Sequence, residues 1–358
     1  LCLKAKGYER LMKKVGVCGH FGIGKNLLNG QTVRTRSVTT ELIKHFGKDE
    51  VTVVDSCGGI MDIVKICFRV LGLFRDCENV IMLPAHRGVR LFTPLYLTYN
   101  FIFRRRIHYI AIGGWINSFL DEHEWLAPLL KKFDAIYVQS AVMKADLEKR
   151  GFFNVVVLYN FKELNVVSPG NIMYPKSEPY KLCTFSRVMK EKGIEDAIDA
   201  VRSVNAHFGR TVYTLDIFGQ VDAGYEERFS ELKKSFPSYI SYGGTIEANK
   251  SVEILKSYFA LLFPTYYKGE GFAGTLIDAM SAGVPVIASD WKYNSEFVVP
   301  GKTGVIIENC NAERLAEELI NIAAAPEKWN SMRLSSLKES EKYKPDIAAR
   351  PLIDRING

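Results

Sequence analysis

The residues with the clearest chemistry lie in one run, which reads KGEGFAGTLIDAMSAGVPVIASD and extends from Lys268 to Asp290. Two acids, Glu270 and Asp278, frame a loop of glycine and alanine that leads directly into a helical segment. The first N–H groups of a helix have no internal partners and carry partial positive charge, so such a loop can bind phosphate. An acid near the start of the helix can accept the hydroxyls of a ribose. The run therefore predicts a site for a phosphorylated nucleoside.

The elements around this loop support the same interpretation. Leu276, Ala279 and Met280 are apolar at helical spacing, which predicts a helix with one face on the core. Gly283 would end that helix, and the apolar run 284–288 predicts a buried strand. An ordinary turn with incidental acids is the alternative, and it would be preferred for an isolated Gly-x-Gly. The complete order of acid, glycines, acid, helix, Gly-x-Pro and strand favours a functional site.

This order resembles the donor-binding signature of the retaining group 1 (family 4) glycosyltransferases. The chain departs from that signature in Asp278, where the family usually has a second glutamate, and in Ala273, where glycine is frequent. A second run, from Phe185 to Gly193, resembles the family's Arg…Lys-Gly element. The resemblance implies the GT-B fold, an α/β architecture in which two Rossmann-like domains face each other across a cleft. It covers residues 181–310 closely and residues 13–160 in outline.

The resemblance implies catalytic roles for three side chains. Glu270 would hold hydroxyls of the transferred sugar, while Arg187 and Lys192 would stabilise the departing diphosphate. Arginine can bind two phosphate oxygens at once, and lysine supplies a compact positive charge. A solvated basic helix start is the alternative for this pair of cations. The substrate-binding residues that the resemblance implies are Gly22, Gly24, Lys25, Gly219, Gly244, Gly271, Phe272, Ala273, Gly274, Thr275 and Asp278.

The loop that begins at Gly19 nearly matches a phosphate-binding P-loop, since it reads GHFGIGKN. A P-loop requires Ser or Thr after the lysine, because the hydroxyl binds magnesium, and this chain has Asn26 there. A nucleotide hydrolase is therefore an alternative function. In the family that the chain resembles, the equivalent loop approaches the donor phosphates and the acceptor, which implies roles for Gly22, Gly24 and Lys25.

The first half matches the family less closely. The family often has a histidine after the strand that here ends near Ile112, whereas this chain has Gly113 and Gly114. His86 is a nearby alternative, and a loop histidine with a structural hydrogen bond is an equal interpretation. The residues on the acceptor side are therefore left open.

Short apolar runs alternate with helical segments along the chain, which predicts parallel, doubly wound sheets. The alternation stops between Phe161 and Tyr180, where SPG and further prolines predict an interdomain linker. We therefore expect a first, acceptor-side domain at 1–165 and a nucleotide-sugar-binding domain at 178–340. The last segment, 344–358, could cross back and complete the first domain, as is common in the family.

The chain has 358 residues, a net charge of +7 and seven cysteines without Cys-x-x-Cys spacing. Scattered cysteines disfavour disulfides and zinc sites and indicate a reducing cytoplasm. Residues 1–150 contain 23 Lys and Arg against 14 Asp and Glu, whereas the remainder is nearly neutral. A basic first half can bind an anionic partner. RNA-binding signatures and zinc-finger spacings are absent, so a membrane surface is preferred to nucleic acid.

The most membrane-like segment extends from Leu91 to Phe103 and precedes Arg104, Arg105 and Arg106. An aromatic segment with adjacent arginines could lie in a lipid interface. A packed helix with a solvated basic end is the alternative. No apolar run reaches the roughly 18 residues that span a bilayer. We expect a cytoplasmic protein that could dock on the inner face of the plasma membrane.

The resemblance implies a retaining, hexosyltransferase-type enzyme that needs neither a metal nor a cofactor. It would move a sugar from a nucleoside diphosphate, with UDP preferred, to a hydroxyl of a lipid-linked or saccharide acceptor. No Asp-x-Asp pair occurs in the sequence, which agrees with metal independence. Assembly of cell-surface polysaccharide or glycolipid is the expected setting. A P-loop-like NTPase and a non-catalytic nucleotide-sugar-binding protein are the alternatives.

Overall fold

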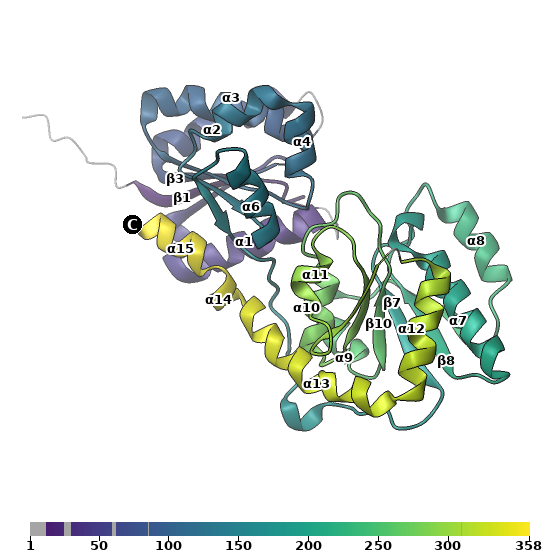
Figure 1. Cartoon of the computed structure of the whole chain (residues 1–358). Helices are drawn as coiled ribbons and strands as arrows, with labels where there is room; N and C mark the ends of the chain where they lie inside the picture. The colour runs from purple at the N-terminus through teal and green to yellow at the C-terminus, as the bar shows by residue number, and fades with distance from the viewer. Residues whose placement is uncertain (1–11, 25–29, 59–61, 85, 309) are drawn as a thin grey trace, which may run out of the picture.

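Two parallel six-stranded sheets, one from each half of the chain, form the framework of the molecule (Figure 1). The computed structural model describes residues 12–24, 30–58, 62–84, 86–308 and 310–358. The first sheet contains β1 (Lys13–Gly19), β2 (Val51–Asp55), β3 (Cys77–Leu83), β4 (Arg106–Ile110), β5 (Ala135–Val138) and β6 (Val155–Val157). The second contains β7 (Tyr180–Phe185), β8 (Tyr213–Phe218), β9 (Ile240–Gly244), β10 (Ala260–Phe263), β11 (Val286–Ser289) and β12 (Gly304–Ile307).

The strand order explains where a ligand site can form. The first sheet has the order β2-β1-β3-β4-β5-β6, and the second has β12-β11-β10-β7-β8-β9. The order therefore reverses between β1 and β3 in one sheet and between β7 and β10 in the other. Open α/β sheets bind ligands beyond the carboxyl ends of the strands at such a reversal. The prediction of two doubly wound α/β sheets is confirmed.

Helices cover both faces of each sheet, so the short strands are mostly buried and apolar. The first half contributes α1 (Gly30–Phe46), α2 (Ile63–Asp76), α3 (His86–Phe103), α4 (Ile116–Glu122), α5 (Ala127–Leu130) and α6 (Ala141–Lys149). The second contributes α7 (Ile194–Phe208), α8 (Glu226–Lys234), α9 (Ser251–Leu255), α10 (Gly274–Ser281), α11 (Asn294–Phe297), α12 (Ala312–Ala324) and α13 (Pro326–Ser340).

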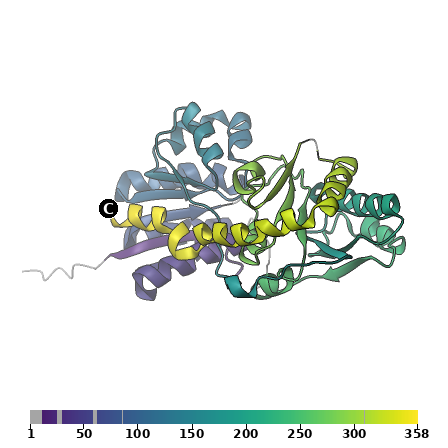
Figure 2. The ribbon, with the colours of Figure 1, turned by 60° about the horizontal axis from the view of Figure 1, so that its bottom comes forward.

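The last two helices, α14 (Pro345–Ala348) and α15 (Arg350–Asn357), lie against the first sheet, although α13 packs on the second. Figures 1 and 2 show this yellow segment crossing from one half of the molecule to the other. Leu352 and Ile356 of α15 share a core cluster with Val15 of β1. Arg106 Nη2 donates to the carbonyl of Ile356 at 2.8 Å and so satisfies one of the last acceptors of α15.

The three arginines that follow α3, Arg104 to Arg106, differ in their contacts and exposure. Arg105 Nε donates to the carbonyl of Phe74 at 2.9 Å, and Arg106 binds α15, so only Arg104 of the three is exposed. The segment Leu91–Phe103 belongs to α3, which packs Phe92 and Tyr96 into the core and therefore agrees with the packed-helix alternative. None of the helices that the structure describes is both long and apolar enough to span a bilayer.

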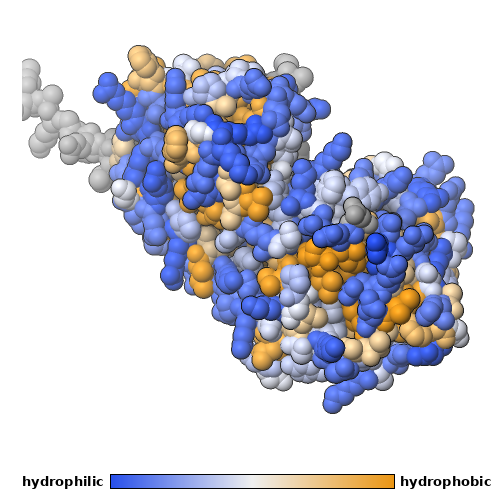
Figure 3. Space-filling view, in the orientation of Figure 1, coloured by the Kyte–Doolittle hydropathy of each residue, from blue (hydrophilic) through white to orange (hydrophobic). Residues whose placement is uncertain are grey.

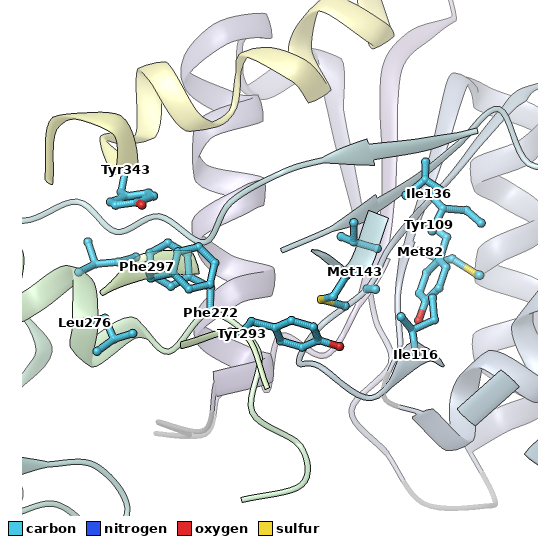
Figure 4. Packing of buried hydrophobic residues seen from close by; sticks show 14 of the residues in the cluster. Met82, Tyr109, Ile116, Ile136, Met143, Phe272, Leu276, Tyr293, Phe297 and Tyr343 are labelled. Atoms are coloured by element: carbon cyan, nitrogen blue, oxygen red, sulfur yellow. The ribbon is translucent and has the colours of Figure 1, made fainter. Parts of the chain in front are cut away.

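One hydrophobic cluster joins the two halves (Figure 4). Phe272, Phe297 and Tyr343 lie on the side of the second sheet, and Tyr293 lies between this group and Met143 of the first half. The rings of Phe272 and Phe297 are stacked, with centroids 3.7 Å apart and planes 4° from parallel. Aromatic pairs of this kind stabilise a structure by more than the burial of their apolar surface alone.

Truncating Leu352 tests how much the returning helix contributes to the first core. Leu352→Ala removes a fully buried side chain, so we expect it to lower the free energy of unfolding by about 2–4 kcal/mol. Ile347→Ala on neighbouring α14, where the side chain is exposed, should change it by less than about 0.5 kcal/mol. Urea denaturation followed by circular dichroism measures both. Equal stability of the two variants would show that α15 does not complete the first core.

Candidate active site

A cleft of about 800 Å3, the interdomain cleft, lies between the two halves and contains most of the predicted residues. Its walls come from the carboxyl ends of β7, β8 and β10, from the start of α10 and from the first half. The predicted residues that line it are Arg187, Lys192, Gly219, Glu270, Gly271, Phe272, Ala273, Gly274, Thr275 and Asp278. Gly22, Gly24 and Gly244 are not among the residues that line it, and Lys25 lies outside the described residues.

The loop of Gly22 and Gly24 contacts its own domain. The amides of Phe21 and Ile23 donate to the two carboxylate oxygens of Asp55 at 2.9 and 2.8 Å. Burial alone would raise the pKa of Asp55, but backbone N–H groups of this loop and of Cys57 outweigh it and lower that pKa. Since a carboxylate of the chain already occupies these amides, they do not form a phosphate cradle as a P-loop would. This geometry disfavours the nucleotide-hydrolase alternative.

Lys192 and Glu270 form a nearly buried ion pair, with Nζ and Oε2 2.5 Å apart. Thr265, which follows β10, donates from Oγ1 to the same carboxylate oxygen at 2.9 Å. Lys192 enters from the turn after β7, so the order reversal of the second sheet places the two residues together. A short, shielded contact between opposite charges fixes both side chains. Glu270 is therefore oriented before any ligand binds.

Arg187 is the more exposed cation of the two. Its Nη1 donates to Asp222 Oδ2 at 3.1 Å, and its guanidinium lies 5.9 Å from the ring centre of Tyr267. The Lys192 ammonium lies 5.1 Å from the same ring. The two predicted cations thus share one aromatic neighbour at the carboxyl end of β7. Exposed ion pairs contribute little stability, so Arg187 can exchange Asp222 for a ligand anion at small cost.

Asp278 lies at the second turn of α10, with only 1% of its side chain exposed. Lys162 Nζ lies 2.6 Å from its Oδ2, and Ser251 donates from Oγ to its Oδ1 at 3.0 Å. Neither partner was predicted. Ser251 begins α9, and Lys162 comes from the first half of the chain. The carboxylate expected to meet a ribose therefore already has a partner on each oxygen.

The loop of residues 268–273, the signature loop, is hydrogen-bonded to the first half. Gly114 donates its amide to the carbonyl of Gly269 at 3.2 Å, and Gln139 Oε1 accepts from the amide of Phe272 at 3.2 Å. Asn160 Nδ2 donates to the carbonyl of Phe272 at 3.1 Å. The amide of Phe272 is thus engaged, which leaves the first turn of α10 as the place where the helix start can meet phosphate.

Two glycines make this contact feasible. A Cβ on Gly114 would lie 1.8 Å from the carbonyl oxygen of Glu270, and Gly113 has a φ of +83°, which glycine adopts without strain. These are the positions where the resembled family often has a histidine. The close backbone approach explains why a larger side chain does not fit here. His86 lines the cleft nearby, with its ring centre 5.8 Å from that of Trp115.

Arg34 of α1 is a further cleft residue that sequence patterns did not reveal. Its guanidinium is buried, donates to the carbonyl of Leu158 at 3.0 Å and lies 4.6 Å from the ring centre of Phe161. Burial lowers the pKa of Arg34 to about 9, so it remains a cation at neutral pH. It fixes the start of the connection between the two sheets. A single arginine within a helix carries no motif that could have identified it.

Comparison with known proteins agrees with this geometry. Residues 174–336 match the family model described as glycosyl transferases group 1. The GtfA subunit of a UDP-N-acetylglucosamine–peptide N-acetylglucosaminyltransferase from Streptococcus gordonii is 32% identical over 145 residues, which are 40% of this chain and 27% of that protein. A poly(glycerol-phosphate) α-glucosyltransferase from Bacillus subtilis is 27% identical over 173 residues, 47% of this chain and 24% of that protein. The resemblance to group 1 glycosyltransferases that was read from the signature is confirmed over residues 174–336.

The aligned segments span only 24–36% of the length of the first four curated relatives. A crystal structure of the Anabaena protein HepE with UDP is similar over the whole molecule, with a TM-score of 0.75 and 14% identity over 97% of this chain and 100% of that one. At this identity the likeness establishes the fold. The predicted GT-B arrangement of two Rossmann-like domains across a cleft is confirmed.

Adding one methyl group at Gly114 tests the contact between the signature loop and the first domain. Gly114→Ala places a Cβ on the carbonyl of Glu270, so the loop must move away, and we expect a loss of about 1–3 kcal/mol in unfolding free energy. Gly72→Ala is the matched control, because a Cβ at this position in α2 has no neighbour within 4 Å. Thermal unfolding and small-angle scattering measure stability and domain separation. Unchanged values for Gly114→Ala would contradict the close contact.

Proposed function

We propose that the chain is a retaining glycosyltransferase that transfers a hexosyl group from a UDP-sugar to an acceptor hydroxyl. The observation that carries the proposal is the pair of Lys192 and Glu270 beside Arg187, at the carboxyl ends of β7 and β10 and facing the start of α10. This arrangement offers cations for a diphosphate and an acid for sugar hydroxyls within one cleft. The names of the two bacterial relatives, both transferases of sugars, support the same class of reaction.

Departure of the diphosphate is the step that the cleft would assist. In the proposed reaction, the bond between the anomeric carbon and the phosphate oxygen breaks, and its electron pair leaves with the UDP. Arg187 and Lys192 would stabilise this growing negative charge, as preorganised cations do in other phosphoryl leaving-group sites. The acceptor oxygen then bonds to the anomeric carbon on the same face, and its proton passes to the departing phosphate oxygen. The cations would make a metal unnecessary.

The acceptor would approach from the first domain. His86, Trp115 and Gln31 line this wall of the cleft, and the described part of the wall contributes no acid. Aromatic rings with polar neighbours suit the alternating apolar and hydroxyl surfaces of a sugar. We propose a saccharide acceptor, which a lipid could carry, in polysaccharide or glycolipid assembly. The name of the Bacillus relative, a glucosyltransferase acting on poly(glycerol-phosphate), supports such a cell-surface setting.

Turnover of nucleotide sugars tests the function directly. We expect UDP at 100 times its Kd to stabilise the protein by about 2.7 kcal/mol, and UDP-glucose or UDP-N-acetylglucosamine to release UDP in the presence of EDTA. Glu270→Gln should lower kcat by about 100-fold or more, because it removes a charge beside the reacting sugar. Glu253→Gln on the surface of α9 is the control and should keep parental kinetics. Binding of UDP without any turnover would instead favour the non-catalytic alternative.

The exposed face of α2 is proposed to dock the first domain on an anionic membrane. Four exposed residues of α2 form this face: Val64, Lys65, Phe68 and Arg69. Val64 lies one helical turn before Phe68, and Lys65 one turn before Arg69, so the face combines apolar and basic side chains. Helix α3 packs beside α2, and Figure 3 shows apolar residues in orange scattered among hydrophilic ones in blue on the visible face of the first domain. Acidic lipid headgroups complement the lysine and the arginine.

Vesicle co-sedimentation tests this surface. We expect binding to vesicles that contain phosphatidylglycerol, a several-fold decrease at high salt, and a similar decrease in the double variant Phe68→Ser/Arg69→Gln. Phe153→Ser is the matched control, because Phe153 is also exposed but lies before β6, away from α2. Equal binding to neutral phosphatidylcholine vesicles, or equal binding by the double variant, would exclude this docking face.

A further inference from the structure

Three of the cations that line the described part of the interdomain cleft are each paired with an acid. Arg187 contacts Asp222 and Lys192 contacts Glu270, as described for the proposed diphosphate site. The third pair joins Lys162 to Asp278. Neither the sequence motifs nor the family resemblance assigned a role to Lys162. Its position nevertheless matches that of the other two cations, since it lines the same cleft and its partner is a residue of the proposed donor site.

The Lys162 ammonium stands beside the start of α10. Its Cε and Nζ lie 2.8 and 3.2 Å from the point where a Cβ on Gly274, the first residue of that helix, would be. The start of a helix attracts anions and repels cations, so a lysine in this place is unfavourable on its own. Asp278, one turn further along α10, compensates this repulsion in the ligand-free protein. The site thus holds a positive charge at the position where a helix start favours phosphate.

A nucleoside diphosphate would change the partners of both residues. Ribose hydroxyls that donate to Asp278 supply the hydrogen bonds that the carboxylate otherwise receives from Lys162 and Ser251. A phosphate beside the first turn of α10 places several negative oxygens near the freed ammonium. Lys162 has 20% of its side chain exposed, whereas Asp278 has 1%, so the lysine is the partner that can move. A flexible four-carbon stem allows such a shift.

We propose that Lys162 is a third phosphate-binding cation of the donor site. In the free protein it neutralises Asp278; when a nucleoside diphosphate binds, its ammonium turns to the diphosphate and the ribose hydroxyls take its place on Asp278. This inference rests on the proposed function, because it requires a nucleoside diphosphate in the cleft. It adds a residue from the segment between the two sheets to a site otherwise built from the second domain.

Calorimetric titration with UDP and with uridine separates the phosphate contact from the ribose contact. Lys162→Met should weaken UDP binding by about 10- to 100-fold, the range expected for a charged hydrogen bond, while uridine binding changes less than about threefold. Lys162→Arg should retain most of the UDP affinity. Lys44→Met is the control: this lysine pairs with Glu163, next to Lys162 in the chain, but does not line the cleft. It should bind UDP as the parent protein does.

A second background removes the other explanation, that Lys162 acts only by neutralising a buried acid. In the variant Asp278→Asn the buried side chain carries no charge, so Lys162 has no acid to neutralise. The double variant Lys162→Met/Asp278→Asn likewise leaves no unpaired charge that could unfold the protein. If Lys162 binds phosphate, the double variant should bind UDP about tenfold or more weakly than Asp278→Asn alone. Equal UDP affinity of these two variants would overturn the inference. Failure of the parent protein to bind UDP would instead overturn the proposed function.

Discussion

The contact between two backbone segments, Gly113–Gly114 of the first domain and Gly269–Glu270 of the second, determines the geometry of the cleft. Glycine is required at position 114 because a Cβ would overlap the carbonyl of Glu270. The amide of Gly114 and the side chains of Gln139 and Asn160 then hold the signature loop by its polar backbone groups. Glu270 within this loop and Asp278 just after it depend on this contact for their positions, since buried backbone groups must stay paired.

The fold was largely predictable because its evidence is local. Short apolar runs separated by helical periodicity identify doubly wound sheets whatever their tertiary partners are. The arginine cluster was harder to interpret, since the side chains of Arg105 and Arg106 donate hydrogen bonds to backbone carbonyls that are distant in the sequence. No pattern in the neighbourhood of residue 105 contains that information.

The same distinction applies to the candidate site. Arg187, Lys192, Glu270 and Asp278 were recognised because each lies in a motif within one domain, and the structure brings them to one cleft. Their partners Ser251 and Lys162 were not, because each pairing joins segments that are distant in the chain. Thr265 lies only five residues before Glu270 but belongs to no motif. Phe272 shows the converse: its motif suggested a ligand contact, but its ring is buried against Phe297 and its amide is bound by Gln139.

The chain passes between the domains twice, once after β6 and once after α13, and the two passages are adjacent: the rings of Tyr159 and Tyr343 lie 5.7 Å apart. A single passage would act as a swivel, allowing the domains to rotate in any direction. Two neighbouring passages instead define an axis, so opening of the cleft is restricted to rotation about the line that joins them. The aromatic rings at this axis move least during such a rotation, whereas the opposite rim of the cleft moves most. A large ligand would therefore enter the cleft at that rim, on the side away from Tyr343.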